Sequence, residues 1–234
     1  MASSSLVVGC FLALSVGLSR RALGLVMAFG AGVLISAVAY ELVGQAAETA
    51  DRGYSVAAGL FAGCAVFYVG DAWIDRLGGD ARKDPGGRQE AGSGLAIVLG
   101  IILDGIPESV VIGLGLLAGS TPSVAVIVAV FLSNLPEAAA ATAGLSRSGW
   151  RTARLYALWA AVVLVSGLSS LAGYAFFGDA SGDVLAFMMA FAGGAILTML
   201  ADTMMPEAFE QGGRLVGVFT TLGFALAFAI SALE

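Results

Sequence analysis

Long apolar segments, interrupted only by short polar clusters, dominate this chain of 234 residues. Hydrophobic residues make up 59% of it and charged residues 12%, against about 25% charged residues in an ordinary soluble domain. A soluble core would not leave such segments uninterrupted, whereas a hydrocarbon layer roughly 30 Å thick requires spans of about 20 apolar residues. The sequence therefore predicts an all-α integral membrane protein.

Eight transmembrane helices account for the apolar segments and leave no room for a second domain, so that 1–234 forms a single transmembrane domain. The connections are short, except for the polar, glycine-rich segment 78–92, which is predicted to be a flexible cytoplasmic loop. The predicted spans are 4–19, 22–46, 55–77, 93–119, 123–147, 154–178, 183–209 and 214–233.

The basic residues predict the orientation, because Lys and Arg accumulate on the cytoplasmic side of a membrane. No basic residue precedes the first apolar segment, and Arg20 and Arg21 follow it, which is the wrong polarity for a cleaved signal peptide. With the N-terminus outside, only Arg52 of the 11 basic residues falls on the outer side. We expect a multi-pass protein of the cell (inner) membrane with both termini outside.

Two segments of the chain resemble each other. Residues 27–48 align without gaps on residues 189–210, and seven of 22 positions are identical. In the predicted orientation the first copy runs from inside to outside and the second runs the other way. This is an inverted repeat, a construction found in many secondary transporters, whose binding sites lie near the midplane at the repeat interface.

A second repeat lies in the middle of the chain. The sequence LDGIPE at 103–108 aligns on LSNLPE at 132–137, again in spans of opposite direction. With the second and seventh spans also paired, the predicted organisation is a 3+2+3 inverted-repeat arrangement.

The central spans carry acidic side chains at the depth of the bilayer centre. Asp104 and Glu108 are four residues apart and share a helix face, as do Asn134 and Glu137, three residues apart. Each charge at this depth costs on the order of 3 kcal/mol and normally faces a bundle interior or a wet cavity. No Lys or Arg lies at that depth in any predicted span, so a bound cation or protons must compensate.

Oxygen atoms alone make up the predicted ligand set. Two prolines release the carbonyls of Leu103 and Leu132 from their usual helical hydrogen bonds, and freed groups at membrane depth can line a cavity. Together with the carboxylates and the hydroxyl of Ser133, they suit a divalent cation, and harder ions more than soft ones. The predicted metal ligands are Asp104, Glu108, Ser133, Asn134 and Glu137. The alternative is a helix kink with a protonated glutamic acid and no role in transport.

The remaining acidic residues are less specific. Glu41 is predicted at the outer mouth of a pathway, Asp202 at its inner exit and Glu207 at the inner interface, although solvation explains each of them as well. An enzyme is not expected, because the chain has no histidine, phosphate loop, nucleophile–base pair or CxxC motif. Nucleic-acid binding is excluded by the net charge of −6 and the lack of a basic face.

The motifs DGIPES and SNLPEAAAATAG resemble the paired Pro-Glu motifs of the ZIP (Zrt/Irt-like) metal transporters. The resemblance implies an eight-span transporter with its site between the fourth and fifth spans. It also implies that Asp104 stands where the family usually has histidine and that Gly105 replaces an asparagine ligand. Ser170 stands where a glutamate often holds a second metal, so the resemblance implies one reduced site without imidazole.

The leading hypothesis is a transporter that moves a divalent cation into the cytoplasm, the cargo being zinc or an ion such as iron(II), manganese, cobalt or cadmium. No organic cofactor is expected, and the partners are the metal ion and the lipid bilayer. Two alternatives stay open: a proton-linked carrier of another solute, and a non-transporting membrane scaffold derived from a transporter. The sequence does not decide between a monomer and a homodimer.

Overall fold

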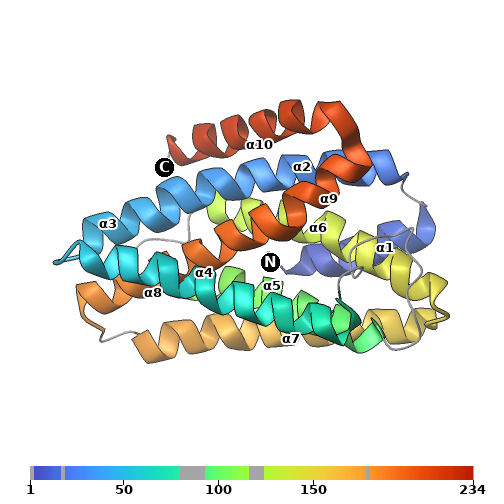
Figure 1. The fold of residues 1–234 in the computed structure, drawn as a ribbon, viewed down its shortest axis with the longest axis horizontal. Helices are drawn as coiled ribbons and strands as arrows, with labels where there is room; N and C mark the ends of the chain where they lie inside the picture. Colours follow the sequence, from blue (N-terminus) through green and yellow to red (C-terminus); the bar gives the residue numbers. More distant parts are fainter. Residues whose placement is uncertain (1–2, 17–18, 80–92, 116–123, 178–179, 234) are drawn as a thin grey trace.

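The computed structural model describes residues 3–16, 19–79, 93–115, 124–177 and 180–233, and the regular structure in these ranges is entirely helical (Figure 1). Residues 80–92 of the predicted cytoplasmic loop lie outside the described residues. The helices, in chain order, are α1 (Ser4–Ser15), α2 (Arg20–Ser36), η1 (Ala37–Gly44), α3 (Gln45–Thr49), α4 (Tyr54–Ile74), η2 (Asp75–Gly79), α5 (Ser93–Gly115), α6 (Val124–Arg147), α7 (Thr152–Phe177), α8 (Gly182–Met199), η3 (Leu200–Met204), α9 (Met205–Gly212), η4 (Gly213–Leu215) and α10 (Val216–Ser231).

Four helical stretches of the described chain are long and apolar enough to cross a membrane: Arg20–Thr49, Tyr54–Leu77, Thr152–Phe177 and Gly182–Ser231. Large apolar side chains such as Phe61 and Phe176 are exposed on their outer faces, as lipid contact requires. The all-helical content and these four stretches are those of a membrane all-α protein. That all eight predicted spans cross the bilayer stays a prediction.

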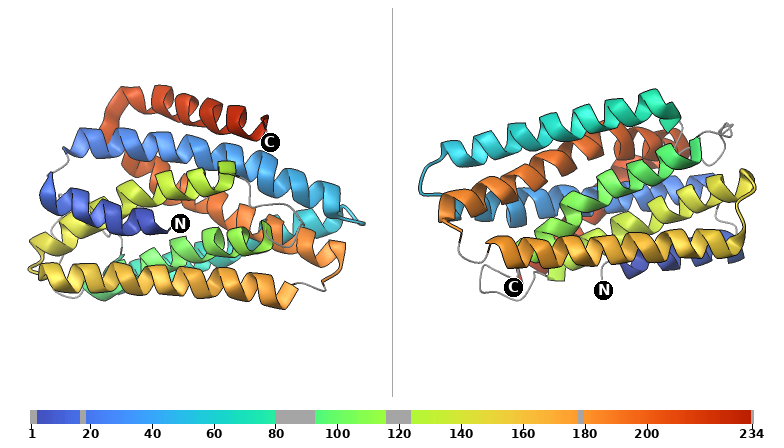
Figure 2. Two further views of the ribbon diagram at one scale, coloured as in Figure 1. Left: turned by 180° about the vertical axis from the view of Figure 1, so that it is seen from behind. Right: turned by 90° about the horizontal axis from the view of Figure 1, so that it is seen from below.

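The helices pack in pairs. The most extensive contacts join α4 to α8, α10 to α2, α1 to α6 and α5 to α7, and further contacts join α2 to α6 and α5 to α8. Figures 1 and 2 show α10 along the outside of α2, at the edge of the bundle opposite α7. The two helices that carry the Pro-Glu motifs, α5 and α6, therefore each pack against one outer helix and one helix of the predicted repeat.

A close crossing joins α2 to α10. A Cβ atom at Gly32 would overlap the carbonyl oxygen of Thr220, and one at Gly223 would overlap the carbonyl oxygen of Phe29. Only glycine lets the two backbones approach this closely, which is how small residues support helix packing in membranes.

The same crossing recurs between α8 and α4. A Cβ atom at Gly194 would overlap the carbonyl oxygen of Leu60, and one at Gly63 would overlap that of Phe191. In the alignment of 27–48 on 189–210, Gly32 corresponds to Gly194. The two aligned segments therefore pack on their outer neighbours through equivalent glycines.

Both aligned segments also change to π-helix. The segment η1 continues α2, and η3 continues α8. Leu200, the first residue of η3, aligns with Val38 inside η1. π-helical turns are rare and occur mostly at functional positions in a helix. A third π-helical segment, η2, continues α4, so what the two aligned segments share is the matching place of the change.

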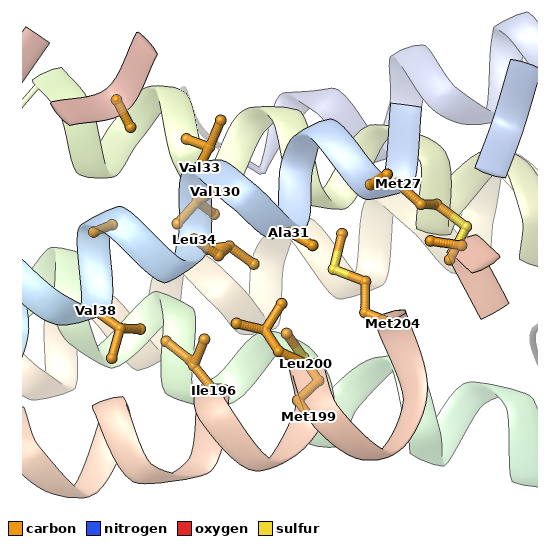
Figure 3. Close-up of a cluster of buried hydrophobic side chains, with 14 of the residues drawn as sticks. Met27, Ala31, Val33, Leu34, Val38, Val130, Ile196, Met199, Leu200 and Met204 are labelled. Atoms are coloured by element: carbon orange, nitrogen blue, oxygen red, sulfur yellow. The ribbon is translucent and has the colours of Figure 1, made fainter. Parts of the chain in front are cut away.

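The centre of the bundle between α2 and α8 is apolar. Figure 3 shows side chains of α2 and η1 facing those of α8 and η3, with Val130 of α6 beside them. Members of this cluster are less than a tenth exposed, among them Met27, Leu34, Ile196 and Met204. These apolar contacts join α2, α8 and α6 at the centre of the bundle.

Candidate cation site

A pocket lies where α1, α5, α6 and α7 meet. The room inside it, about 10 Å³, is close to what a single water molecule needs. Two of the predicted ligands, Asn134 and Glu137, share it with residues from the other three helices. The lining residues are Leu6, Ile101, Gly105, Asn134, Glu137, Trp159, Val162 and Ser166.

The helical spacing of α6 brings Asn134 and Glu137 to the pocket. Residues three apart lie on one face of a helix, and this face is turned toward α1, α5 and α7 rather than toward the apolar core. Asn134 is 7% exposed, and its side chain makes no hydrogen bond within the described part of the chain. Its amide is therefore available to a ligand in the pocket.

Only some of the predicted ligands on α5 lie within the described residues. Asp104 is 3% exposed and immediately precedes the pocket-lining Gly105, but it is not itself a lining residue. The side chains of Pro107 and Glu108 lie outside the described residues. Within the described part, no three acidic or cysteine residues lie close enough together to hold a metal ion. The described acidic ligand at the pocket is Glu137.

Ser133 is not among the residues that line the pocket, and its backbone lies against α2. A Cβ atom at Gly30 of α2 would lie 3.2 Å from the Cα atom of Ser133 and 3.0 Å from the carbonyl oxygen of Leu132. The Ser133 hydroxyl is fully buried and donates to the carbonyl oxygen of Val130 at 3.2 Å. The helix α6 runs without interruption through Pro136. Pro136 leaves the carbonyl oxygen of Leu132 without its usual helical partner. This oxygen lies against Gly30 of α2.

Ser170 joins α7 to α5 through a hydrogen bond and a close backbone contact. Its hydroxyl donates to the carbonyl oxygen of Ser109 at 2.6 Å, and a Cβ atom at Gly113 would overlap the Ser170 carbonyl oxygen. The Ser109 hydroxyl in turn donates to the carbonyl oxygen of Gly105 at 2.6 Å. The position at which the resemblance expects a second-metal glutamate is therefore used for helix packing.

Two pocket residues were missed by reasoning from the sequence. Trp159 is fully buried, and its indole N–H donates to the hydroxyl of Thr142 at 2.8 Å. Ser166 lies one turn before Ser170 on α7, and that spacing of four in SGLSS was the available signal. Neither is acidic, and so a search for charged residues at membrane depth passes over both.

The three predicted pathway residues lie away from this pocket. Glu41 is 8% exposed in η1 and accepts hydrogen bonds from the amide of Gln45, at 3.0 Å, and from the hydroxyl of Ser231. Asp202 is exposed in η3, and Glu207 is half-buried in α9. None of the three lines the pocket of Asn134 and Glu137.

The pocket combines a carboxylate, an amide and a hydroxyl in a largely buried setting. Such oxygen ligands suit one hard or borderline divalent cation, and in its absence the carboxyl group could instead hold a proton. A comparison with protein-family models finds no match to this chain, and no curated protein matches it.

Proposed function

We propose that this protein transports a divalent metal ion into the cytoplasm through a site between α5 and α6, in the manner of the ZIP transporters that its Pro-Glu motifs resemble. The observation that carries the proposal is the pocket at which Asn134 and Glu137 meet residues of α1, α5 and α7. The proposed ligands are Asp104, Glu108, Asn134 and Glu137.

Charge supports a cation as the cargo. Asp104 is almost fully buried and Glu137 is half-buried, and the sequence holds no Lys or Arg between positions 89 and 146. Acidic side chains inside a membrane normally pair with one another, with a cation or with a proton, and mark ion pathways. A passing divalent ion would compensate these carboxylates without a resident basic residue.

The helix pairing supports an inverted-repeat transporter. If the first three spans are related to the last three, then α2 corresponds to α8 and α10 to α4. The crossing of α2 on α10 and that of α8 on α4 use equivalent glycines, and the pair α1–α6 likewise corresponds to α7–α5. We infer a 3+2+3 arrangement in which α1, α5, α6 and α7 move against α2, α4, α8 and α10.

The proposed orientation places both termini outside, in the cell membrane, as the distribution of basic residues predicts. The ion would enter from the outer side and leave past Asp202. Oxygen ligands without imidazole favour manganese, cobalt and iron(II), with zinc also accepted, because zinc commonly takes His or Cys but tolerates carboxylates.

Uptake of manganese into proteoliposomes tests the proposal. Wild-type protein is compared with Glu137→Ala and Glu108→Ala, and Glu48→Gln, which changes an exposed acid of α3, serves as the matched control. We expect both Ala variants to lose uptake and the control to retain it. Undiminished uptake in both Ala variants would overturn the proposal.

A further inference from the structure

Ser166 is a largely buried serine at the candidate pocket. It lies on α7, is 7% exposed and lines the same pocket as Asn134 and Glu137. Its side chain makes no hydrogen bond within the described part of the chain. Buried polar groups are almost always hydrogen-bonded, and serines within a helix commonly bond to a carbonyl of the preceding turn. The Ser166 hydroxyl is not one of the fully buried side-chain atoms that lack a partner, so it is open to the space that Ser166 lines and is available to a ligand there.

The neighbouring serines of α7 differ from Ser166 in their surroundings. Ser170 donates to the Ser109 carbonyl at 2.6 Å, in the close contact between α7 and α5. Ser169 is half-buried and lines an adjoining pocket between these helices, which Ser166 also lines but Asn134 and Glu137 do not. Of these three serines, Ser166 alone faces the two predicted ligands of α6, and the chain thereby supplies its own internal controls.

We propose that Ser166 is a ligand of the transported cation, so that α7 joins α6 in forming the site. The inference rests on the proposed function and assigns a specificity-determining role to this side chain. The Asn134 amide oxygen, the Glu137 carboxylate and the Ser166 hydroxyl then form one face of the ion's coordination shell. A neutral, hard hydroxyl in place of a thiolate or imidazole favours manganese, cobalt or magnesium over softer ions such as cadmium.

The variant Ser166→Cys tests this role, because a thiol at the same position is a soft ligand of nearly the same size. Binding of manganese and of cadmium to purified protein is measured by calorimetry for the wild type, Ser166→Cys, Ser169→Cys and Ser170→Cys. We expect Ser166→Cys to raise the preference for cadmium over manganese about tenfold, the scale of one altered ligand. Ser169→Cys and Ser170→Cys should keep the wild-type preference. Cys10 and Cys64 are present in every variant, so their contribution cancels.

Two further variants test whether the hydroxyl of Ser166 is what binds the ion. Ser166→Thr retains the hydroxyl and should keep the wild-type preference, whereas Ser166→Ala should weaken the binding of both ions. The role of Ser166 would be overturned if Ser166→Cys and Ser169→Cys showed the same preference for cadmium. If Glu137→Ala also abolished metal binding, the proposed site itself would still stand. Unchanged metal binding in Glu137→Ala would instead overturn the proposed site itself.

Discussion

The hydroxyl of Ser231, at the C-terminal end of α10, donates a hydrogen bond to Oε1 of Glu41 in the π-helical segment η1. The other carboxylate oxygen of Glu41 accepts from the amide of Gln45 at 3.0 Å. A buried carboxylate is thereby satisfied by two neutral donors, one of them 190 positions away in the sequence. Glu41, predicted at the mouth of a pathway, joins two helices in the structure.

Removing this donor should loosen α10. We expect Ser231→Ala to lower the free energy of unfolding by about 0.6 kcal/mol, the average for a side-chain hydrogen bond between membrane helices. Unfolding in mixed detergent micelles gives the measurement. Thr221→Val is the control, because the exposed hydroxyl of Thr221 bonds only to Gly217 in its own helix. Equal stability of the two variants would show that the bond to Glu41 contributes nothing.

The glycine crossings should not tolerate alanine. We expect Gly32→Ala and Gly194→Ala each to cost about 1–3 kcal/mol of unfolding free energy, because the added methyl group would overlap a carbonyl of the neighbouring helix. Gly217→Ala on α10 meets no atom within 4 Å, and should be neutral or stabilising by up to about 1 kcal/mol. The crossings would be wrong if Gly32→Ala were as stable as Gly217→Ala.

The fluorescence of Trp159 should report on metal binding in the pocket. It is one of three tryptophans and lines the pocket together with Glu137, so a paramagnetic ion bound there should quench its fluorescence. We expect manganese to quench a Trp73→Phe, Trp150→Phe protein, and magnesium to quench it far less. Adding Glu137→Ala should abolish saturable quenching. Quenching that persists in that variant would place the ion elsewhere.

The proposed orientation is open to a labelling test. In a background of Cys10→Ala and Cys64→Ala, Arg52→Cys should react with an impermeant thiol reagent in intact cells. Arg151→Cys should react only after the membrane is permeabilised. Both arginines are exposed, so access decides the result. The reverse pattern would invert the topology and with it the proposed direction of transport.

The helices and their approximate ends followed from the sequence. The segment predicted at 123–147 is α6 at Val124–Arg147, and that predicted at 154–178 is α7 at Thr152–Phe177. Hydropathy decides these elements, because the length of an apolar segment is a local property. The shared face of Asn134 and Glu137 also followed, because helical spacing alone fixes it.

Contacts between distant segments did not follow from the sequence. Ser133 could be placed beside Asn134 in the chain, but which helix each side chain meets depends on the rotation of α6 in the bundle. In the structure the backbone of Ser133 lies against Gly30 of α2, and Asn134 lines the pocket. The contribution of Ser166 depends in the same way on the packing of α7 against α5, which a hydropathy pattern does not contain.

The most direct measurement is anomalous diffraction from crystals of this protein grown with manganese. We predict a peak in the pocket where α5, α6 and α7 meet, within coordination distance of Glu137 and Asn134 and next to Ser166. Crystals of Glu137→Ala should lose that peak. A fully occupied manganese site elsewhere, with no peak beside Glu137, would contradict the proposal that this pocket carries the ion.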